Sequence, residues 1–193
     1  LGGAGHARAL TDALGKYGTF IGFDLDHDAI LRARQVLANV TPKTHLIEAD
    51  FRNLTSELAK IEITHIDKVL YDLGWSSFQL AGGRGFSLKS AEPLLMTFTK
   101  DPKRDLTAEK IVNEWAEESL ADVIYGWGEE RYSRRIAKAI VERRAQKPFT
   151  TARELAEVIY AAVPPRYRHG RIHPATRTFQ ALRIAVNDEL GAL

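Results

Sequence analysis

The first third of the chain alternates short apolar runs with amphipathic segments. The apolar runs predict buried strands at residues 19–24, 45–50 and 68–72. The amphipathic segments predict helices at residues 6–14, 28–38 and 55–61. Because strand and helix alternate, the pattern favours βαβ units that form a parallel sheet.

The pattern changes after Gly74. Residues 75–106 show no clear period, and they hold three glycines and two prolines. A long irregular stretch inside a compact domain is usually functional or disordered. Helical patterns then follow at residues 107–127, 129–146 and 151–163, and a last helix is predicted from about Ala175. Thr107 and Thr151 are predicted N-caps, the second with the Glu154 of a capping box.

Both ends of the chain resemble interior positions of a longer protein. A Gly-rich turn stands at residues 1–5 with no strand before it. Residues 179–193 keep a helical pattern that shows no clear stop signal. We therefore expect the chain to be an internal fragment.

Composition narrows the class of protein. The 193 residues suit one domain, and 45% hydrophobic with 27% charged residues is typical of a soluble globular chain. No apolar run approaches the roughly 18 residues that cross a bilayer. The absence of cysteine excludes disulfides, thiolate metal sites and cysteine nucleophiles, and it fits a reducing compartment such as the cytoplasm.

Charge is distributed unevenly along the chain. Residues 131–183 hold 13 Lys and Arg against 3 Asp and Glu, a net +10, whereas residues 1–130 carry a net −6. A basic block of this size is a candidate surface for a polyanion. The alternative interpretation is a set of solvated helix faces.

The first chemical motif is the turn Gly2-Gly3-Ala4-Gly5-His6, which opens a helix. Glycines let the backbone approach a ligand, and a helix N-terminus presents free N–H groups. Asp24 follows 19 residues after Gly5 at the end of a strand, where an acid can bind ribose hydroxyls. The pair predicts an adenosine-cofactor site, although Asp24 can also act only as a cap. The position three after Gly5 is Arg8, so the dehydrogenase pattern of three glycines is incomplete.

Two further strand ends face the same predicted site. Phe51 can cover an adenine ring, or it can simply pack in the core. Asp72 begins the sequence Asp-Leu-Gly-Trp-Ser-Ser-Phe-Gln, in which Trp75 can stack on a base or pack under the long loop. No metal site is expected, because His169 and His173 are separated by Gly170 and precede Pro174.

Several blocks together make the chain similar to the bacterial ribosomal RNA small-subunit methyltransferase H (MraW-like) family. The match runs in family order over essentially the whole chain, and its longest block is residues 173–183. The other blocks are Gly5-His6, residues 22–26, Asp72-Leu-Gly, Ser76-Ser77 with Gln79-Leu80, residues 84–87, residues 128–131, residues 134–137 and residues 187–191.

The resemblance implies a fold, a reaction and a set of residues. The fold is α/β, a partial Rossmann-like class I methyltransferase sheet with an inserted helical subdomain. Residues 1–100 would belong to the cofactor domain, 101–172 to the substrate-recognition insertion, and 173–193 to a helix returning to the first domain. The reaction is transfer of a methyl group from S-adenosyl-L-methionine to N4 of a cytidine in small-subunit ribosomal RNA, without a metal or a membrane. Cofactor contacts would fall on Ala4, Gly5, His6, Asp24, Phe51, Asp72 and Gln79.

The substrate side is interpreted from the residues and from the family together. Asp72 is the candidate catalytic residue, because an acceptor on the N4–H would favour the rehybridised amine. Trp75 or Phe86 can receive an unstacked base. The candidate RNA contacts among the basic residues are Arg84, Arg131, Arg134, Arg135 and Arg177, the last of which can equally serve in a structural ion pair.

The chain also departs from the family. Ala4 replaces a glycine, which adds a methyl group near the cofactor, and Trp75 and Ala81 replace an aliphatic residue and an acid. The family's first strand would precede Leu1 and lie between the strands at 19–24 and 68–72. We therefore predict that these two strands are separated or poorly paired.

Two rival functions remain open from the sequence alone. One is an NAD-type nucleotide-binding oxidoreductase domain, against which the missing third glycine counts. The other is a non-catalytic RNA-binding module on the same fold. The fragment itself can be inactive, and the sequence does not specify an oligomeric state.

Overall fold

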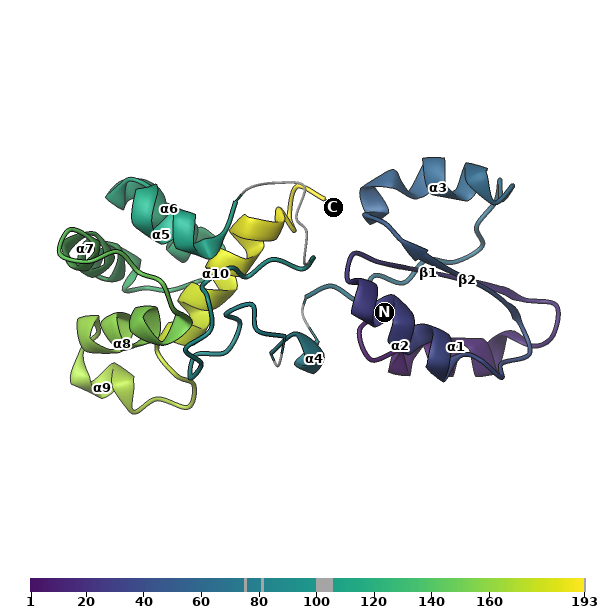
Figure 1. Ribbon diagram of the computed structural model, residues 1–193, viewed down its shortest axis with the longest axis horizontal. Coiled ribbons are helices and arrows are strands. Elements are labelled where there is room, and N and C mark those ends of the chain that lie inside the picture. Colours follow the sequence, from purple (N-terminus) through teal and green to yellow (C-terminus); the bar gives the residue numbers. More distant parts are fainter. Residues whose placement is uncertain (75, 81, 100–105, 193) are drawn as a thin grey trace. The chain divides into compact units, whose positions relative to one another are not determined.

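The computed structural model describes residues 1–74, 76–80, 82–99 and 106–192. These residues form two compact units, and each is described by itself (Figure 1). We call residues 1–78 the α/β unit, and residues 79–97 with 106–191 the helical unit. The predicted division into three segments, at residues 100 and 172, stays a prediction.

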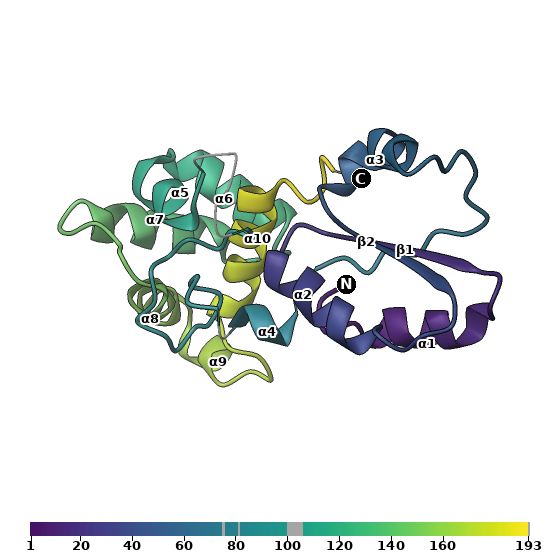
Figure 2. The ribbon, with the colours of Figure 1, turned by 45° about the vertical axis from the view of Figure 1, so that its right-hand side comes forward.

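The α/β unit is built on two parallel strands. β1 (Thr19–Asp24) pairs with β2 (Lys43–Glu48), so that Asp24 lies opposite Glu48 at the carboxyl end. Figures 1 and 2 show α1 and α2 on one face of these strands and α3 on the other. The helices are α1 (Gly5–Leu14), α2 (His27–Val36) and α3 (Leu54–Lys60), with a 3-10 turn, η1 (Phe51–Asn53), before α3. The first two predicted strands and the three predicted helices of this region are confirmed.

The predicted strand at residues 68–72 is wrong. These residues have no strand structure, and their apolar side chains are exposed: Val69 by 59%, Leu70 by 62% and Tyr71 by 55%. A strand exists only through hydrogen bonds to a neighbour, and among the described residues β1 pairs with β2 alone. The prediction that residues 19–24 and 68–72 do not pair with each other is confirmed.

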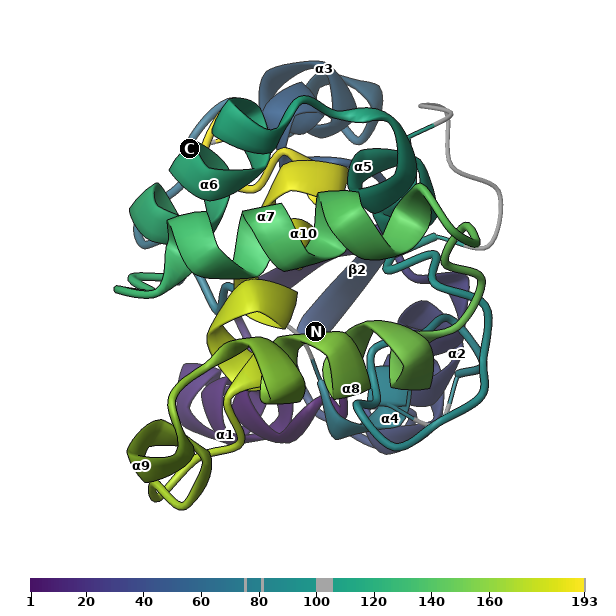
Figure 3. The same cartoon turned by 90° about the vertical axis from the view of Figure 1, so that its left-hand side faces the viewer.

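The helical unit follows a short helix, α4 (Ser77–Leu80), along the chain. Its helices are α5 (Ala108–Glu114), α6 (Glu117–Gly126), α7 (Ser133–Arg144), α8 (Ala152–Ala162), α9 (Pro165–Arg168) and α10 (Ala175–Asn187). Helix α10 packs against α5, α6 and α8, and Figure 3 shows α7 and α8 in front of it. One apolar core joins these helices, and its largest fully buried side chains include Ile124, Phe149, Leu155 and Leu182.

The helix predicted over residues 107–127 is two helices. Trp115 and Ala116 are extended, with ψ of 150° and 152°, so α5 ends and α6 begins afresh at Glu117. Glu117 and Glu118 stand in the first turn of α6, where acidic side chains favour a helix N-terminus. The apolar period alone did not reveal this break, because it continues through both helices.

Threonine caps fix the starts of α5 and α8 as predicted. The hydroxyl of Thr107 accepts a hydrogen bond from the N–H of Lys110 at 3.2 Å, and that of Thr151 accepts from the N–H of Glu154 at 3.3 Å. The Glu154 carboxylate reaches back to the N–H of Thr150 rather than to that of Thr151, at 3.1 Å. Hydrogen bonds from Lys147 and Thr150 lower the pKa of Glu154 to about 2.

A close approach between α6 and α10 requires a glycine at position 128. A Cβ atom there would lie 2.5 Å from the carbonyl oxygen of Arg177 and 2.7 Å from that of Ile124. Gly126, two residues earlier, faces open space, and a Cβ there would contact nothing within 4 Å. The two positions therefore form a matched pair.

We expect Gly128→Ala to destabilise the protein by about 1–3 kcal/mol, because the backbones must separate to admit the methyl group. Gly126→Ala should be neutral or slightly stabilising, since alanine favours the helix by up to about 1 kcal/mol. Urea unfolding followed by circular dichroism measures both. Equal stability of the two variants would contradict the close approach.

Candidate functional site

The Gly-rich turn before α1 is anchored by the acid at the end of β1. The Oδ2 atom of Asp24 accepts a hydrogen bond from the N–H of Gly2 at 3.1 Å and lies 3.0 Å from the backbone nitrogen of Leu1. Its Oδ1 atom accepts from the N–H of Asp26 at 2.9 Å. The side chain stays 18% exposed. Asp24 thus joins the turn, β1 and the start of α2 at one point.

Arg32 on α2 holds the same turn from its carbonyl side. Its Nε atom donates to the carbonyl of Gly2 at 3.3 Å, and its guanidinium carbon lies 4.5 Å from the ring centroid of Phe78. The Phe78 ring in turn covers Gly3, where a Cβ atom would lie 3.0 Å from it. The sequence does not reveal this role of Arg32, since no motif marks a basic residue in the second turn of a helix as the partner of a glycine turn.

Ala4 takes the left-handed conformation, which a glycine adopts without strain. Its φ is 60° and its ψ is 17°, and its side chain is fully buried beside Ala7, Ala33 and Leu37. The methyl group therefore faces the core of the α/β unit. Consequently, the extra carbon does not occupy the surface where a cofactor would lie.

Asp72 also contacts the turn that Asp24 anchors. Its Oδ2 atom lies 3.0 Å from Nδ1 of His6, in the first turn of α1. Both side chains are open to solvent, His6 by 74% and Asp72 by 55%. The two predicted acids thus reach opposite ends of one five-residue segment, Gly2 and His6.

The end of β2 contributes an aromatic side chain and an acid. Phe51, in η1, packs edge-on against Tyr71, and the two ring centroids are 5.8 Å apart. Tyr71 directly precedes Asp72 in the chain. Glu48 pairs with His27 at the start of α2, with Oε2 and Nδ1 2.6 Å apart. The strand ends therefore converge through contacts on the turn, on Tyr71 and on α2.

The structure thus brings together most of the predicted cofactor residues of the α/β unit. Asp24, His6 and Asp72 meet at the turn that holds Ala4 and Gly5, and Phe51 lies beside Tyr71. Trp75 and the side chain of Gln79 lie outside the described residues. Their predicted contacts with base and cofactor stay predictions.

Two predicted RNA contacts lie in the loop 82–97 of the helical unit. Arg84 is buried at 6% exposure, and its guanidinium carbon lies 5.9 Å from the ring centroid of Phe86. Phe86 is half-buried against the helical core. Arg84 also accepts a backbone hydrogen bond from Met96 at 2.7 Å, so this part of the loop is held in place.

Arg131 lies on a small aromatic cluster formed by the residue before α7 and by α9. Its guanidinium carbon is 4.9 Å from the Tyr132 ring centroid and 5.0 Å from that of Tyr167. Beneath it, the fully buried Glu130 accepts hydrogen bonds from the Tyr167 hydroxyl at 2.6 Å and from the N–H of Tyr132 at 2.9 Å. Burial and this carboxylate raise the pKa of Tyr167 to about 12.

The other predicted arginines differ in their surroundings. Arg134 and Arg135 are exposed in the first turn of α7. Arg177 is half-buried, and its Nη1 atom donates to the carbonyl of Glu129 at 2.6 Å, across the loop that joins α6 to α7. Glu129 has a φ of 52°, so this hydrogen bond supports a strained turn.

The described residues lack both a membrane-spanning helix and a metal-binding cluster. No helix there combines the length and apolar character that a bilayer crossing needs. The same residues contain no cluster of three or more His, Asp or Glu side chains that can hold a metal ion.

Comparison with known proteins gives a consistent result. The model of the MraW methylase family matches residues 1–193. Proteins named ribosomal RNA small subunit methyltransferase H are 47% identical in Geotalea daltonii, 44% in Brevibacillus brevis and 43% in Clostridioides difficile. Each alignment covers all of this chain, which spans 61–62% of the length of these relatives.

We expect Tyr167→Phe to destabilise the protein by about 1–3 kcal/mol at pH 7, because the buried Glu130 loses a donor. A tyrosine pKa raised from 10 to about 12 supplies stability that is present below pH 10 and lost as the pH rises to 12. The variant should therefore lose less stability than the parent over that interval. Tyr125→Phe, at a 66% exposed tyrosine, is the control for urea unfolding at each pH. Parallel pH curves for Tyr167→Phe and the parent would refute the assignment.

Proposed function

The chain belongs to the MraW methylase family, and from this premise we propose that it forms part of a ribosomal RNA methyltransferase. In this proposal the enzyme transfers a methyl group from S-adenosyl-L-methionine to the N4 amine of a cytidine in small-subunit ribosomal RNA. The names of the relatives support the class of substrate. The observation that carries the proposal is that Asp24 and Asp72 contact the same Gly-rich turn.

The residues around this turn fit an adenosine cofactor without a phosphate. A Cβ atom on Gly5 would meet nothing within 4 Å, so the start of α1 borders open space. Asp24 keeps part of its carboxylate exposed for ribose hydroxyls, and Phe51 is a partly exposed ring for the adenine. Arg8, where a third glycine would let a pyrophosphate approach, carries a side chain bonded to Asp12 at 3.0 Å. This arrangement favours S-adenosylmethionine over NAD.

We assign the remaining predicted cofactor contacts of the α/β unit to the same edge. The backbone of Ala4, Gly5 and His6 would line the cofactor at the start of α1. Asp72 would contact the cofactor in addition to its role toward the substrate, and Gln79, in the helical unit, stays a predicted cofactor contact. When bound, S-adenosylmethionine supplies an electrophilic methyl group on a sulfonium sulfur.

Asp72 is the residue we assign to the reacting amine. The N4 lone pair of cytosine is delocalised into the ring, so an acceptor on its N–H favours the rehybridised, nucleophilic form. Oδ2 of Asp72 is held by His6, which leaves Oδ1 to accept the N4–H and to hold the proton that the methylated amine loses. Placing the amine about 3–3.5 Å from the methyl carbon can supply up to roughly 7–11 kcal/mol of the barrier reduction.

The helical unit is the part we assign to RNA. We propose that residues 101–172 are an inserted substrate-recognition subdomain of a class I methyltransferase fold, and that residues 173–193 return to the cofactor domain. Arg131, Arg134 and Arg135 would bind phosphates, and Arg177 would support the turn that carries Arg131. Trp75 or Phe86 would receive the unstacked target base, and Arg84 is a further RNA contact that we propose. Such an enzyme would act in the cytoplasm, where ribosomes assemble.

Cofactor titration and turnover, measured on the natural full-length protein, test the proposal. S-adenosylmethionine should bind and NAD should not. Asp24→Asn should weaken S-adenosylmethionine binding by about tenfold or more, since a charged acceptor is lost. Asp72→Ala should lower turnover on small ribosomal subunits by about 100-fold and affect cofactor affinity far less.

Asp12→Asn is the matched control, because Asp12 is an exposed acid on α1 that pairs with Arg8. It should leave both binding and turnover unchanged. Equal losses of affinity and turnover in Asp72→Ala would reduce Asp72 to a binding residue. Tight NAD binding would overturn the choice of cofactor.

Removal of Arg134 and Arg135 should weaken RNA binding and flatten its salt dependence. Each phosphate contact contributes roughly 0.7–0.9 to the slope of log affinity against log salt, so the double alanine variant should lose about 1.5 units of slope. Fluorescence anisotropy between about 50 and 200 mM salt measures it. Lys147→Ala, which removes an exposed cation paired with Glu154, should leave the slope unchanged. An unaltered slope in the double variant would exclude these two residues from the interface.

A further inference from the structure

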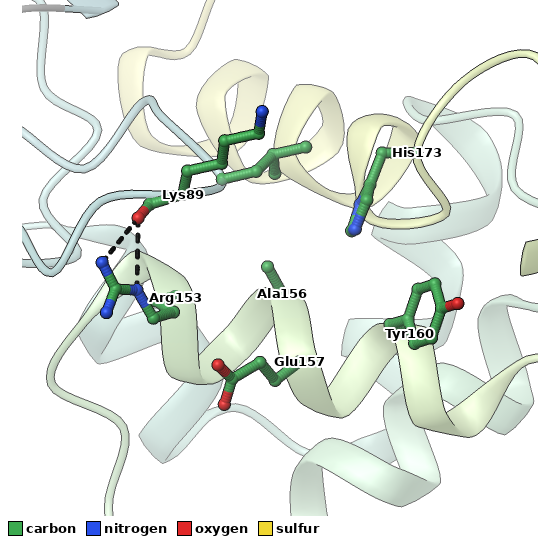
Figure 4. A pocket seen from close by; sticks show the side chains of 7 residues that line it. Lys89, Arg153, Ala156, Glu157, Tyr160 and His173 are labelled. Atoms are coloured by element: carbon green, nitrogen blue, oxygen red, sulfur yellow. Dashed lines mark hydrogen bonds between the residues drawn. The ribbon is translucent and has the colours of Figure 1, made fainter.

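A surface hollow on α8 has features that the proposed methyl-transfer site does not use. It has a volume of about 350 Å³ and is lined by Leu88, Lys89, Arg153, Ala156, Glu157, Tyr160 and His173. We call it the α8 hollow. Figure 4 shows that α8 supplies one side, while Lys89 and His173 come from two other segments of the helical unit.

The spacing along α8 explains why these side chains share one side of the hollow. Counted from Arg153, the residues Ala156, Glu157 and Tyr160 follow after three, four and seven positions. This spacing places all four side chains on one face of a helix. Ala156 is almost fully buried, and Leu88 packs on the helical core. The hollow therefore has an apolar floor and a polar rim.

Hydrogen bonds hold the loop that carries Lys89 against α8. The Nε and Nη2 atoms of Arg153 donate to the carbonyl of Lys89 at 3.2 and 2.9 Å, as the dashed lines in Figure 4 show. The N–H of Arg153 donates to the carbonyl of Ser90 at 3.1 Å. The loop that carries Lys89 is thus attached to the first turns of α8, and little conformational freedom is left to lose on binding.

The opposite wall is an aromatic stack. The rings of Tyr160 and His173 lie 5.8 Å apart at 26°, and the guanidinium carbon of Arg168 lies 5.3 Å from the Tyr160 ring centroid. Nδ1 of His173 accepts a hydrogen bond from the N–H of Ala175 at 3.1 Å, which leaves the proton on Nε2. Partial burial and the charge of Lys89 lower the pKa of His173, so the ring is mainly neutral at pH 7.

The rim offers polar groups that other side chains do not satisfy. Within the described part of the chain, the Lys89 ammonium and the Glu157 carboxylate have no ion-pair partner. A rim carboxylate disfavours a bare anion such as inorganic phosphate. It suits a ligand that carries N–H donors as well as a negative charge.

A planar wall, a free ammonium and a neighbouring carboxylate together match a nucleotide. Residues 131–183, which contain α8 and His173, carry a net charge of +10, which favours a polyanion over a polypeptide. Aromatic platforms beside cations are also the general means of binding single-stranded nucleic acid. A lone aromatic pair or a lone lysine would carry no such argument, but here three segments bring them to one hollow.

We infer that the α8 hollow binds one unpaired nucleotide of the RNA, with its base on the Tyr160–His173 wall and its phosphate at Lys89. This inference rests on the proposed function only in taking RNA as the substrate. The nucleotide is a second recognition point, separate from the cytidine that would be methylated. Its binding would set the register of the RNA on the helical unit.

The test uses the natural full-length protein, without cofactor, and a 5′-fluorescein-labelled single-stranded RNA of about ten nucleotides. Tyr160→Ala should weaken binding by about tenfold through loss of stacking, and Tyr160→Phe should restore it. Lys89→Ala should weaken binding and lower the salt slope by about 0.7. Tyr160→Ala should leave that slope unchanged, which a merely structural role would not predict.

Tyr125→Ala is the matched control, because Tyr125 is a 66% exposed tyrosine of the same unit that does not line the hollow. It should bind RNA like the parent, and inorganic phosphate at millimolar concentration should not compete. If Tyr160→Ala and Lys89→Ala bind RNA as tightly as Tyr125→Ala does, the inference is overturned. A hollow that binds a polypeptide instead of RNA would give that same result. Loss of binding in Tyr160→Phe would overturn the stacking role.

The same experiment separates this inference from the proposed function. RNA binding is measured without S-adenosylmethionine, so a failure of cofactor binding or methyl transfer leaves its outcome unaffected. Conversely, each of these variants could methylate ribosomal RNA at the parent rate and bind it with the parent affinity. That result would support the proposed function and overturn the inference about the α8 hollow.

Discussion

The carboxylate of Asp24 accepts hydrogen bonds from the backbone on both sides of the candidate cofactor site, from Gly2 before α1 and from Asp26 before α2. A glycine turn has no side chains with which to fix itself, and its conformational entropy is high when it is free. Its shape must therefore be imposed from outside. Asp24 does this from the N–H side and Arg32 from the carbonyl side, and this arrangement places His6 within reach of Asp72.

The two units order their candidate functional surfaces by the same physical means. In the helical unit, the buried Glu130 is satisfied by Tyr167 and by the backbone of Tyr132, and the aromatic pair supports Arg131. A buried carboxylate without donors would be costly, so these partners fix the orientation of everything bonded to it. In both units one acid organises the backbone, while the groups exposed around it remain available for a ligand.

Much of this arrangement was predictable, because it depends on local signals. The caps at Thr107 and Thr151 follow from short-range hydrogen bonding. The meeting of Asp24 and Asp72 near the glycine turn was predicted from the shared edge of parallel strands, and it is observed although residues 68–72 form no strand. The prediction of a strand at residues 68–72 was wrong because a strand does not depend on local signals alone. Its residues have the right composition, but a strand depends on a neighbour that sequence pattern cannot supply.

Other features lay beyond sequence reasoning because they need several distant segments. The break at Trp115 and Ala116 interrupts a continuous apolar period, and the burial of the Ala4 methyl depends on the packing of α2. The α8 hollow needs the loop at Lys89, one face of α8 and His173 shortly before α10. None of these three segments carries a motif for a ligand, so only their placement in space reveals the site.

The exposed row at Val69, Leu70 and Tyr71 also bears on how the protein behaves in solution. Among the described residues, the outer edge of β1 has unpaired N–H and C=O groups, and such an edge together with an apolar segment is a template for intermolecular strand pairing. The net charge of +2 on 193 residues provides little electrostatic repulsion against such pairing. A neighbouring strand or a charged substitution that covers this row would therefore raise the solubility of the chain.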